Sequence, residues 1–240
     1  MASANSSVPA FDSSELKELK ARLVDGCHIL DREGITDGYG HVSVRIRGTD
    51  AFLTLAGVSP GRATLDRLVL LDFDGRYLGG EKSPPYEWPI HACIMRSRPD
   101  VTSVCHTHSK WSSLFSVLKG GLRPLHMYAR FLPPKGPPIY PEAGLIGTVE
   151  RGEALAKALK DSAAVLMRAH GDAVVGASLE EAILRTIRLA FIGELAHMAV
   201  AHGEPYYLTE DELAVFSADP AFPARPWEYY LSRAHERRSP

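Results

Sequence analysis

Two histidines in alternate positions, His106 and His108, have the spacing that most directly suggests chemistry. They end the run from Val101 to His108, whose composition predicts a strand. Residues two apart in a strand point to the same face, about 6.6 Å apart along the chain, so their imidazoles can converge on one ion. Such a pair favours zinc or another first-row divalent metal. A surface edge strand can carry the same pair, so further ligands must decide.

Two more residues can complete a metal site. His170 follows the apolar run Ala164–Met167, which places its imidazole at the end of a predicted core strand. Glu87 lies in the first turn of a helix predicted after Pro84 and Pro85. Either residue can instead be structural, as a core histidine or as an acid at a helix N-terminus. Together, three imidazoles and a carboxylate form a complete set that leaves a metal open to substrate.

Other scaffolds that use a His-x-His pair fit this sequence less well. A cupin needs a glutamate a few residues after the pair, whereas residues 109–113 read Ser-Lys-Trp-Ser-Ser. An amidohydrolase barrel needs eight βα units, and the order of predicted elements is too irregular for that fold.

The elements that must position these residues alternate irregularly between helix and strand. Helical periodicity covers residues 16–34, 86–98, 110–118, 150–159 and 178–202, and short apolar runs predict strands at 42–46, 52–55, 68–71, 101–108 and 164–167. Residues 122–140 form a Pro-rich loop, and the tail from Glu204 is expected to be irregular and aromatic. Residues 1–12 are expected to be flexible, which leaves one mixed α/β domain over 13–240.

The composition excludes several classes of partner. The chain has 27 Lys and Arg against 29 Asp and Glu, so no bulk charge favours nucleic acid or an anionic membrane. No apolar run approaches the roughly 18 residues of a membrane span, and the start lacks a signal-peptide pattern, so we expect a cytoplasmic protein. Cys27, Cys93 and Cys105 are expected to be reduced core thiols. Ten histidines remain the unusual feature.

The sequence resembles the class II aldolase/adducin family, whose members carry a glutamate at a helix start, a His-x-His strand and a later Arg-x-His-Gly turn. Here these motifs are Glu87, His106-Thr107-His108 and Arg168-Ala169-His170-Gly171, in that order. The resemblance covers about residues 14–207. It implies a three-layer α/β/α fold with a central, mainly antiparallel sheet, and a homotetramer with active sites between subunits.

The same resemblance implies one divalent metal ion per subunit. His106, His108 and His170 would hold it, with Glu87 as a further ligand or as an acid/base. Mn²⁺ and Zn²⁺ are the ions expected first, and Mg²⁺ or Fe²⁺ would also suit such a set.

Two segments argue against a phosphorylated sugar as the substrate. Sugar-phosphate aldolases of the family hold a phosphate with a Ser-Gly-Asn-x-Ser segment and a Ser-Ser-Glu segment. This sequence has Tyr39-Gly40-His41-Val42-Ser43-Val44-Arg45 and Ser83-Pro84-Pro85-Tyr86-Glu87 in their places, and proline offers neither an amide N–H nor a hydroxyl. The segment Gly-His-Val-Ser-Val-Arg and the Pro226–Tyr230 tail resemble the branch that decarboxylates hydroxylated benzene or pyridine dicarboxylates.

This branch implies a metal-dependent carbon–carbon lyase that decarboxylates a hydroxylated aromatic carboxylate through a metal-stabilised enolate-type intermediate. The alternative is a retro-aldol lyase acting on a small non-phosphorylated hydroxy-oxo acid or sugar, because both reactions use the same electron sink. A non-catalytic, adducin-like interaction module is a third possibility, which the complete set of metal ligands disfavours.

Further site residues follow from what such a reaction needs. A substrate carboxylate must be bound, and a proton must return to the carbon that loses CO₂. His41, Ser43 and Arg45 follow a Gly-rich turn and are the candidate substrate contacts, with Arg45 able to make bidentate hydrogen bonds. Family aldolases carry a tyrosine proton donor across the subunit interface near the position of Tyr128. The candidate proton donors are Glu87, His126, Tyr128 and Tyr229.

Overall fold

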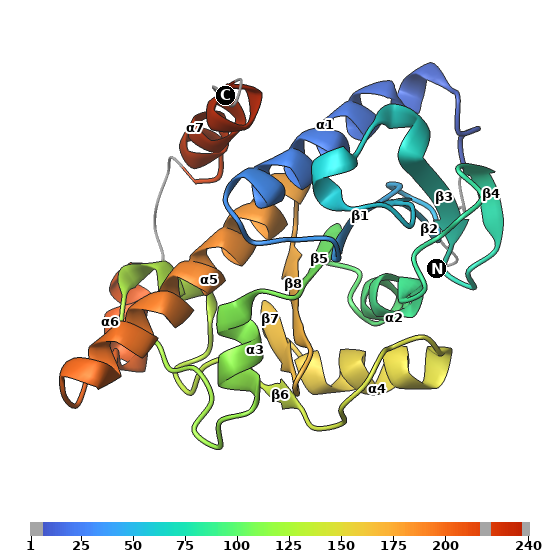
Figure 1. The fold of residues 1–240 in the computed structure, drawn as a ribbon. Coiled ribbons are helices and arrows are strands. Elements are labelled where there is room, and N and C mark those ends of the chain that lie inside the picture. The colour runs from blue at the N-terminus through green and yellow to red at the C-terminus, as the bar shows by residue number, and fades with distance from the viewer. Residues whose placement is uncertain (1–6, 217–221, 237–240) are drawn as a thin grey trace.

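A mixed sheet lies at the centre of the fold. The computed structural model describes residues 7–216 and 222–236, and within them one eight-stranded sheet has the order β4-β3-β2-β1-β5-β8-β7-β6 (Figure 1). Only β6 and β7 pair in parallel among the described strands, so the sheet is mainly antiparallel, as predicted. The strands are β1 His41–Arg45, β2 Ala51–Leu55, β3 Leu68–Asp72, β4 Tyr77–Gly80, β5 Ser103–Thr107, β6 Ile139–Tyr140, β7 Ala164–Met167 and β8 Gly171–Gly176.

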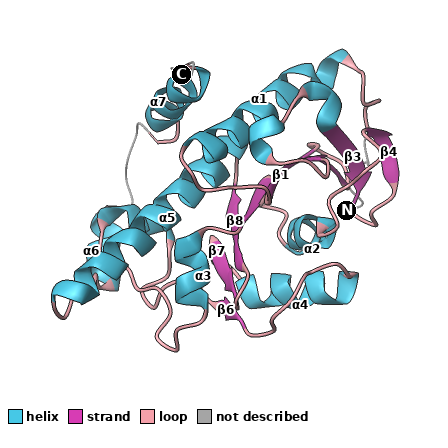
Figure 2. Ribbon diagram, in the orientation of Figure 1, coloured by secondary structure: helices cyan, strands magenta, loops and turns pink. Residues whose placement is uncertain are grey.

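Helices cover both faces of this sheet, which confirms the predicted three-layer α/β/α architecture (Figure 2). One layer holds α1, α3 and α5, and the other holds α2 and α4. The helices are α1 Ser14–Arg32, α2 Trp88–Ser97, α3 Lys110–Ser116, α4 Val149–Leu159, α5 Leu179–His202, α6 Glu210–Val215 and α7 Ala224–His235. No helix among the residues described is both long and apolar enough to cross a membrane.

Alternation along each strand decides which layer a side chain enters. On β3, Leu68 and Leu70 pack into the core under α1 and α5, whereas Val69 and Leu71 pack against α2 and α4. Successive strand residues point to opposite faces, so a strand buried on both sides becomes a continuous apolar run. That burial explains why the strands were recognisable as short apolar runs.

The same alternation turns the chemistry-bearing residues toward α2. Val42 and Val44 of β1 belong to the α1 and α5 core, so His41 and Ser43 face the opposite layer. On β5, Val104 packs in the α2 and α4 core, and the next residue on that face is His106. His41 and His106 are direct neighbours in the β1–β5 register.

The segment after Glu204 differs from the predicted irregular tail, because it contains two helices. Helix α6 begins at a capping box in which Thr209 and Glu212 bond reciprocally. Helix α7 is amphipathic, and its Trp227 and Tyr230 pack against the core of the α1 layer. Its stripe is aromatic rather than leucine-rich and follows Pro223, which hides the helical period in the sequence.

The N-terminal segment and the cysteines can be compared with the predictions. Residues 1–6 of the segment expected to be flexible lie outside the described residues, whereas Phe11 stacks under the Lys20 ammonium group and packs on Gly79. The three cysteines are free and buried, as expected. Burial raises the pKa of Cys27 to about 12 and that of Cys93 to about 11, so these thiols are protonated at neutral pH.

Candidate metal centre

The four residues predicted as metal ligands converge on one point. Glu87, His106, His108 and His170 each offer a ligand atom, and these atoms all lie within 4.8 Å of one another. They come from three separate parts of the chain: the start of α2, the end of β5 and the β7–β8 turn. Glu87 and His106 are buried, whereas His108 and His170 are partly exposed, so the centre opens to solvent on the side of these two histidines.

The spacing of these atoms matches a tetrahedral metal site. The Nε2 atom of His108 lies 3.2 Å from Nε2 of His106 and 3.0 Å from Nε2 of His170. Glu87 Oε2 lies 3.5 Å from the Nε2 atoms of both His106 and His170. A tetrahedral shell with bonds of about 2.0–2.1 Å has edges of about 3.3–3.4 Å. The donor set therefore has the composition and the dimensions that a divalent cation requires.

The backbone of β8 orients His106 for this role. His106 Nδ1–H donates to the carbonyl oxygen of Asp172 at 2.7 Å. A proton held on Nδ1 leaves the lone pair on Nε2, which faces the other ligands. Asp172 is the β8 partner of Thr107 in the register, so pairing of β5 with β8 itself sets this tautomer.

Glu87 is the N-cap of α2 and lies one residue before the helix, not in its first turn as predicted. The Ile146 amide donates to Glu87 Oε1 at 2.6 Å, which leaves Oε2 facing the histidines. Burial acts to raise the pKa of this carboxyl, but the adjacent His106 and His170 imidazoles and the Ile146 amide outweigh burial and hold the pKa well below its usual range. The side chain is therefore a carboxylate that is ready to bind a cation.

A tight turn carries His170 between β7 and β8. Ala169 has a positive φ of 57°, uncommon for a residue with a side chain, and its amide donates to Ser116 Oγ at 3.0 Å. At Gly171 an added Cβ would overlap the carbonyl oxygen of Thr107, so only glycine lets β8 approach β5 this closely. Backbone geometry therefore explains the glycine that follows His170.

A second pair of imidazoles, not predicted as a pair, lies directly behind the ligands. His41 Nδ1 is 2.6 Å from His91 Nε2, and His91 Nδ1 is 2.6 Å from Ser43 Oγ. The ring of His41 lies 5.0 Å from that of His106, centroid to centroid. Burial lowers the pKa of His91 to about 3 and that of His41 well below its ordinary value, so both are neutral. Only the position of His91 one helical turn after Glu87 could have signalled its role.

The three residues predicted to contact the substrate lie in different surroundings. His41 lies beside His106 and keeps about 9% of its surface exposed, whereas Ser43 is fully buried against His91. Arg45, at the other end of β1, donates from Nε to the Val101 carbonyl at 3.1 Å and from its terminal nitrogen to the carbonyl oxygens of Met95 and Arg98. Arg45 therefore binds the C-terminal end of α2 and is not available to a substrate carboxylate.

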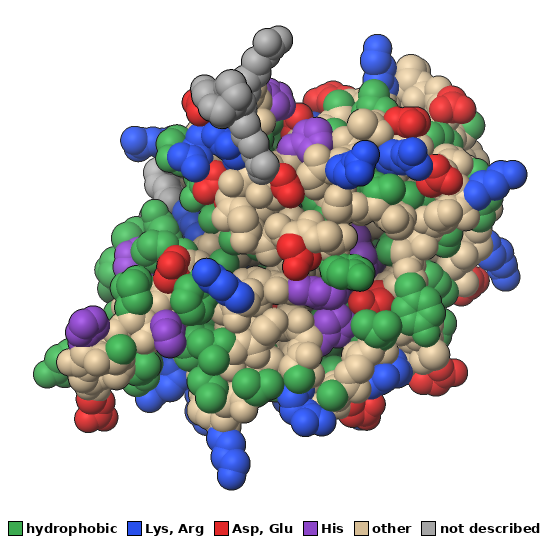
Figure 3. Space-filling view, in the orientation of Figure 1, with side chains coloured by type: hydrophobic (Ala, Val, Ile, Leu, Met, Phe, Trp, Pro, Cys, Tyr) green, Lys and Arg blue, Asp and Glu red, His purple; other side chains and the backbone are tan. Residues whose placement is uncertain are grey.

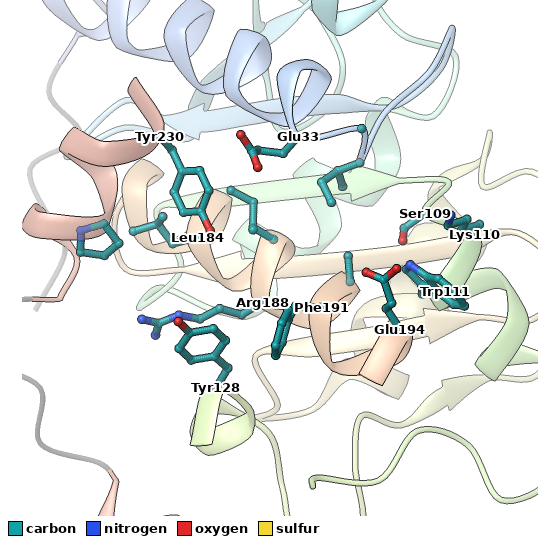
Figure 4. A pocket seen from close by; sticks show the side chains of 15 residues that line it. Glu33, Ser109, Lys110, Trp111, Tyr128, Leu184, Arg188, Phe191, Glu194 and Tyr230 are labelled. Atoms are coloured by element: carbon teal, nitrogen blue, oxygen red, sulfur yellow. The ribbon is translucent and has the colours of Figure 1, made fainter. Parts of the chain in front are cut away.

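The predicted proton donors other than Glu87 lie elsewhere on the chain. Tyr128 lines a cavity of about 310 Å³ together with Arg188 and Tyr230 (Figure 4). His126 accepts a hydrogen bond from the Tyr128 amide, and Tyr229 on α7 is 56% exposed. Within the part of the chain that the structure describes, no hydrogen bond or ring contact joins these residues to the four ligands.

The surface view agrees with this arrangement. Figure 3 shows histidine side chains gathered with acidic ones in the middle of one face, next to hydrophobic side chains. A partly exposed set of three imidazoles and a carboxylate can hold a divalent cation and leave a coordination position for a ligand from solvent.

Comparison with known proteins identifies related chains. Residues 21–197 match the model of the class II aldolase and adducin N-terminal domain. The L-fuculose phosphate aldolase of Escherichia coli strain CFT073 is 30% identical over 203 residues, which span 84% of this chain and 93% of that protein. The 3,4-dihydroxyphthalate decarboxylase of Terrabacter sp. strain DBF63 is also 30% identical, over 205 residues covering 80% of this chain and 86% of the relative.

The fold has solved counterparts as well. The structure of an aldolase II superfamily protein from Pseudomonas syringae superposes with a TM-score of 0.81 at 24% identity, over 92% of this chain and 94% of that one. An aldolase and a decarboxylase are each 30% identical to this chain, and the aldolase match covers the larger share of both proteins, so the two reactions cannot be separated by identity.

Proposed function

Since this chain belongs to the class II aldolase and adducin family, whose members provide lyases of both kinds, we propose that it is a divalent-metal-dependent carboxy-lyase. Its substrate in this proposal is a hydroxylated aromatic carboxylate, with a benzene or pyridine ring. The four-residue donor set supports the metal dependence, and the segments around that set support the choice of substrate.

The proposed metal ligands are His106, His108 and His170, with Glu87 as the fourth. Imidazole and carboxylate donors suit Zn²⁺ or Mn²⁺. When bound, such a cation would supply a Lewis acid that accepts the electron density left by the breaking C–C bond. When it is not a ligand, Glu87 can instead act as the acid/base and take up and return a proton at Oε2, because Oε1 accepts from the Ile146 amide.

The observation that carries the choice of substrate is the shortage of hydrogen-bond donors at the start of α2. Pro85 and Pro89 have no amide N–H, and the Trp88 and Ile90 amides bond to the carbonyl oxygens of Pro85 and Glu87. A phosphate dianion usually receives a dense array of such donors. A carboxylate held by a cation and by one neighbouring side chain, for which we propose His41, needs far fewer.

The position of the aromatic residues supports a tetramer with sites between subunits. His126, Tyr128 and Tyr229 do not reach the four ligands of their own chain. In a homotetramer these side chains can approach the metal centre of a neighbouring subunit, where one of them would return the proton. Exposure of Tyr229 is consistent with that use.

Retro-aldol cleavage of a small non-phosphorylated hydroxy-oxo acid or sugar is the second candidate, favoured by the 30% identity to an L-fuculose phosphate aldolase. The test is to load the protein with Zn²⁺ or Mn²⁺ and supply 3,4-dihydroxyphthalate and related hydroxylated dicarboxylates. We expect CO₂ to be released. An aldehyde product from hydroxy-oxo acids, with no CO₂ from any aromatic acid, would replace the proposal with the second candidate.

A further inference from the structure

Two exposed tyrosines neighbour residues of the metal centre, Tyr39 by a ring contact with His108 and Tyr86 by its place next to Glu87 in the sequence. Tyr39 is 70% exposed and Tyr86 is 68% exposed. Single exposed aromatic residues are ordinary on a protein surface. These two differ from other exposed aromatic residues because Tyr39 stacks on a proposed ligand, and Tyr86 packs on the loop that holds Glu87.

Tyr39 covers a ligand. Its ring lies 5.8 Å from the ring of His108 with an interplanar angle of 23°, so the two rings are stacked. The Tyr39 amide donates to Asp37 Oδ1 at 2.9 Å, which holds the turn before β1. Gly40 follows with a φ of 99°, and a Cβ there would lie 3.0 Å from the His106 carbonyl oxygen. The turn therefore passes close enough to β5 to keep the Tyr39 ring over His108.

Tyr86 stands on the side of the carboxylate. It directly precedes Glu87 and follows two prolines, which restrict the backbone before it. Its ring lies so close to Gly147 that a Cβ at that glycine would overlap the ring atoms. Gly147 adjoins Ile146, whose amide holds Glu87 Oε1. The same short loop thus supports the Tyr86 ring and orients the ligand.

We infer that Tyr39 and Tyr86 are the specificity-determining walls of the substrate site, and that they hold the flat ring of an aromatic carboxylate whose oxygens bind at the metal centre. A ring placed there has Tyr39 on the His108 side and Tyr86 on the Glu87 side. Aromatic rings attract one another in offset or edge-to-face contact beyond the gain from burial. An aliphatic hydroxy acid presents the same oxygens but gains nothing from either wall.

This inference rests on the proposed function for the position of the ligand, but it is tested by binding rather than by turnover. The full-length, Zn²⁺-loaded protein is titrated calorimetrically with 2,3-dihydroxybenzoate and, separately, with glycolate. The variants are Tyr39→Leu and Tyr86→Leu, which remove the flat face, and Tyr39→Phe and Tyr86→Phe, which keep it. Tyr206→Leu is the matched control, because Tyr206 is 99% exposed.

We expect each leucine variant to bind 2,3-dihydroxybenzoate about five- to tenfold more weakly, which corresponds to about 1.0–1.4 kcal/mol. The phenylalanine variants and the control should bind it like the wild type. Zinc content and glycolate affinity should stay unchanged in all of them. Phenylalanine variants as weak as the leucine ones would overturn the stacking argument.

Three other results would overturn the inference about Tyr39 and Tyr86. These are failure of the wild type to bind the aromatic acid, unchanged affinity in both leucine variants, or an equal loss of affinity for glycolate and for the aromatic acid. Failure of the proposed function is a separate result, namely no release of CO₂ from any hydroxylated aromatic acid. A protein that binds aromatic acids through both tyrosines but releases an aldehyde from another substrate keeps this inference and loses that proposal.

Discussion

His91 Nε2 lies 2.6 Å from His41 Nδ1, so a neutral pair of imidazoles is buried directly behind His106, a proposed metal ligand. Ser43 completes the chain at the far nitrogen of His91. One proton lies between the two nitrogens, which commits Nδ1 of His41 to His91. Because this buried pair stays neutral, it should lower the free energy of unfolding at low pH.

The first prediction is a loss of stability at low pH that is caused by His91. Burial lowers the pKa of His91 from 6.5 to about 3, so below about pH 6.5 the unfolded chain takes up a proton that the folded chain refuses. The free energy of unfolding should fall as the pH decreases from about 6.5 toward 3, by up to about 1.4 kcal/mol per pH unit from this group. His91→Gln should flatten the dependence. Urea unfolding of the metal-free protein between pH 4.5 and 7.5 measures both slopes, and equal slopes would contradict the assignment.

Loss of a ligand should remove the metal. We expect dialysed wild type to retain about one divalent ion per chain, measured by inductively coupled plasma mass spectrometry, and His106→Ala and His108→Ala to retain little. His202→Ala, at the exposed end of α5, is the control. Removing the ion with a chelator should also lower the melting temperature of the wild type, because the ion binds only the folded chain. Undiminished metal in both ligand variants would refute the site.

Glu87→Gln keeps the size of the side chain and removes its charge. Because Oε2 faces the histidines, this change should lower kcat by about 10²-fold or more. Glu153→Gln, on the exposed side of α4, serves as the control. Single-turnover assays in saturating metal separate the loss of a proton-transfer group from weaker metal binding. A rate unchanged under those conditions would exclude Glu87 from catalysis.

Gly171→Ala should destabilise the protein although the change is one methyl group. The new Cβ would overlap the Thr107 carbonyl oxygen and push β8 away from β5, at a cost of about 1–3 kcal/mol. Gly38→Ala is a matched control, because nothing lies within 4 Å of a Cβ at that position. Thermal unfolding of the two variants makes the comparison. A Gly171→Ala protein as stable as Gly38→Ala would show that the strands can separate freely.

The sequence was informative where side-chain type and period carry the information. The His-x-His pair, the buried runs and the order of the motifs were sufficient to predict the three layers and the four side chains that cluster at the candidate metal centre. The role of Arg45 could not be predicted in this way, because an arginine in a strand gives the same sequence pattern whether it contacts a substrate or the end of a helix. His41, Ser43 and Arg45 all face α2, but His41 contacts His91 whereas Arg45, at the other end of β1, contacts the C-terminal end of that helix.

Two short elements, β8 and α6, could not be predicted for a different reason. Strand β8 begins and ends at glycines and includes Asp172, so its apolar run in the sequence is only three residues long, from Ala173 to Val175. Helix α6 has only six residues, too few for a helical period to show. The position of His91 depends on the packing of α2 over β1, which is a tertiary relation that no local pattern encodes.

The order of strands in the sheet has a consequence for the kinetics of folding. The bond from His106 to Asp172 joins residues 66 positions apart, and it forms only when β5 has paired with β8. Contacts so distant along the chain form late, since closing the intervening loop must come first. We therefore expect added metal to slow the unfolding of this chain while leaving its rate of refolding nearly unchanged.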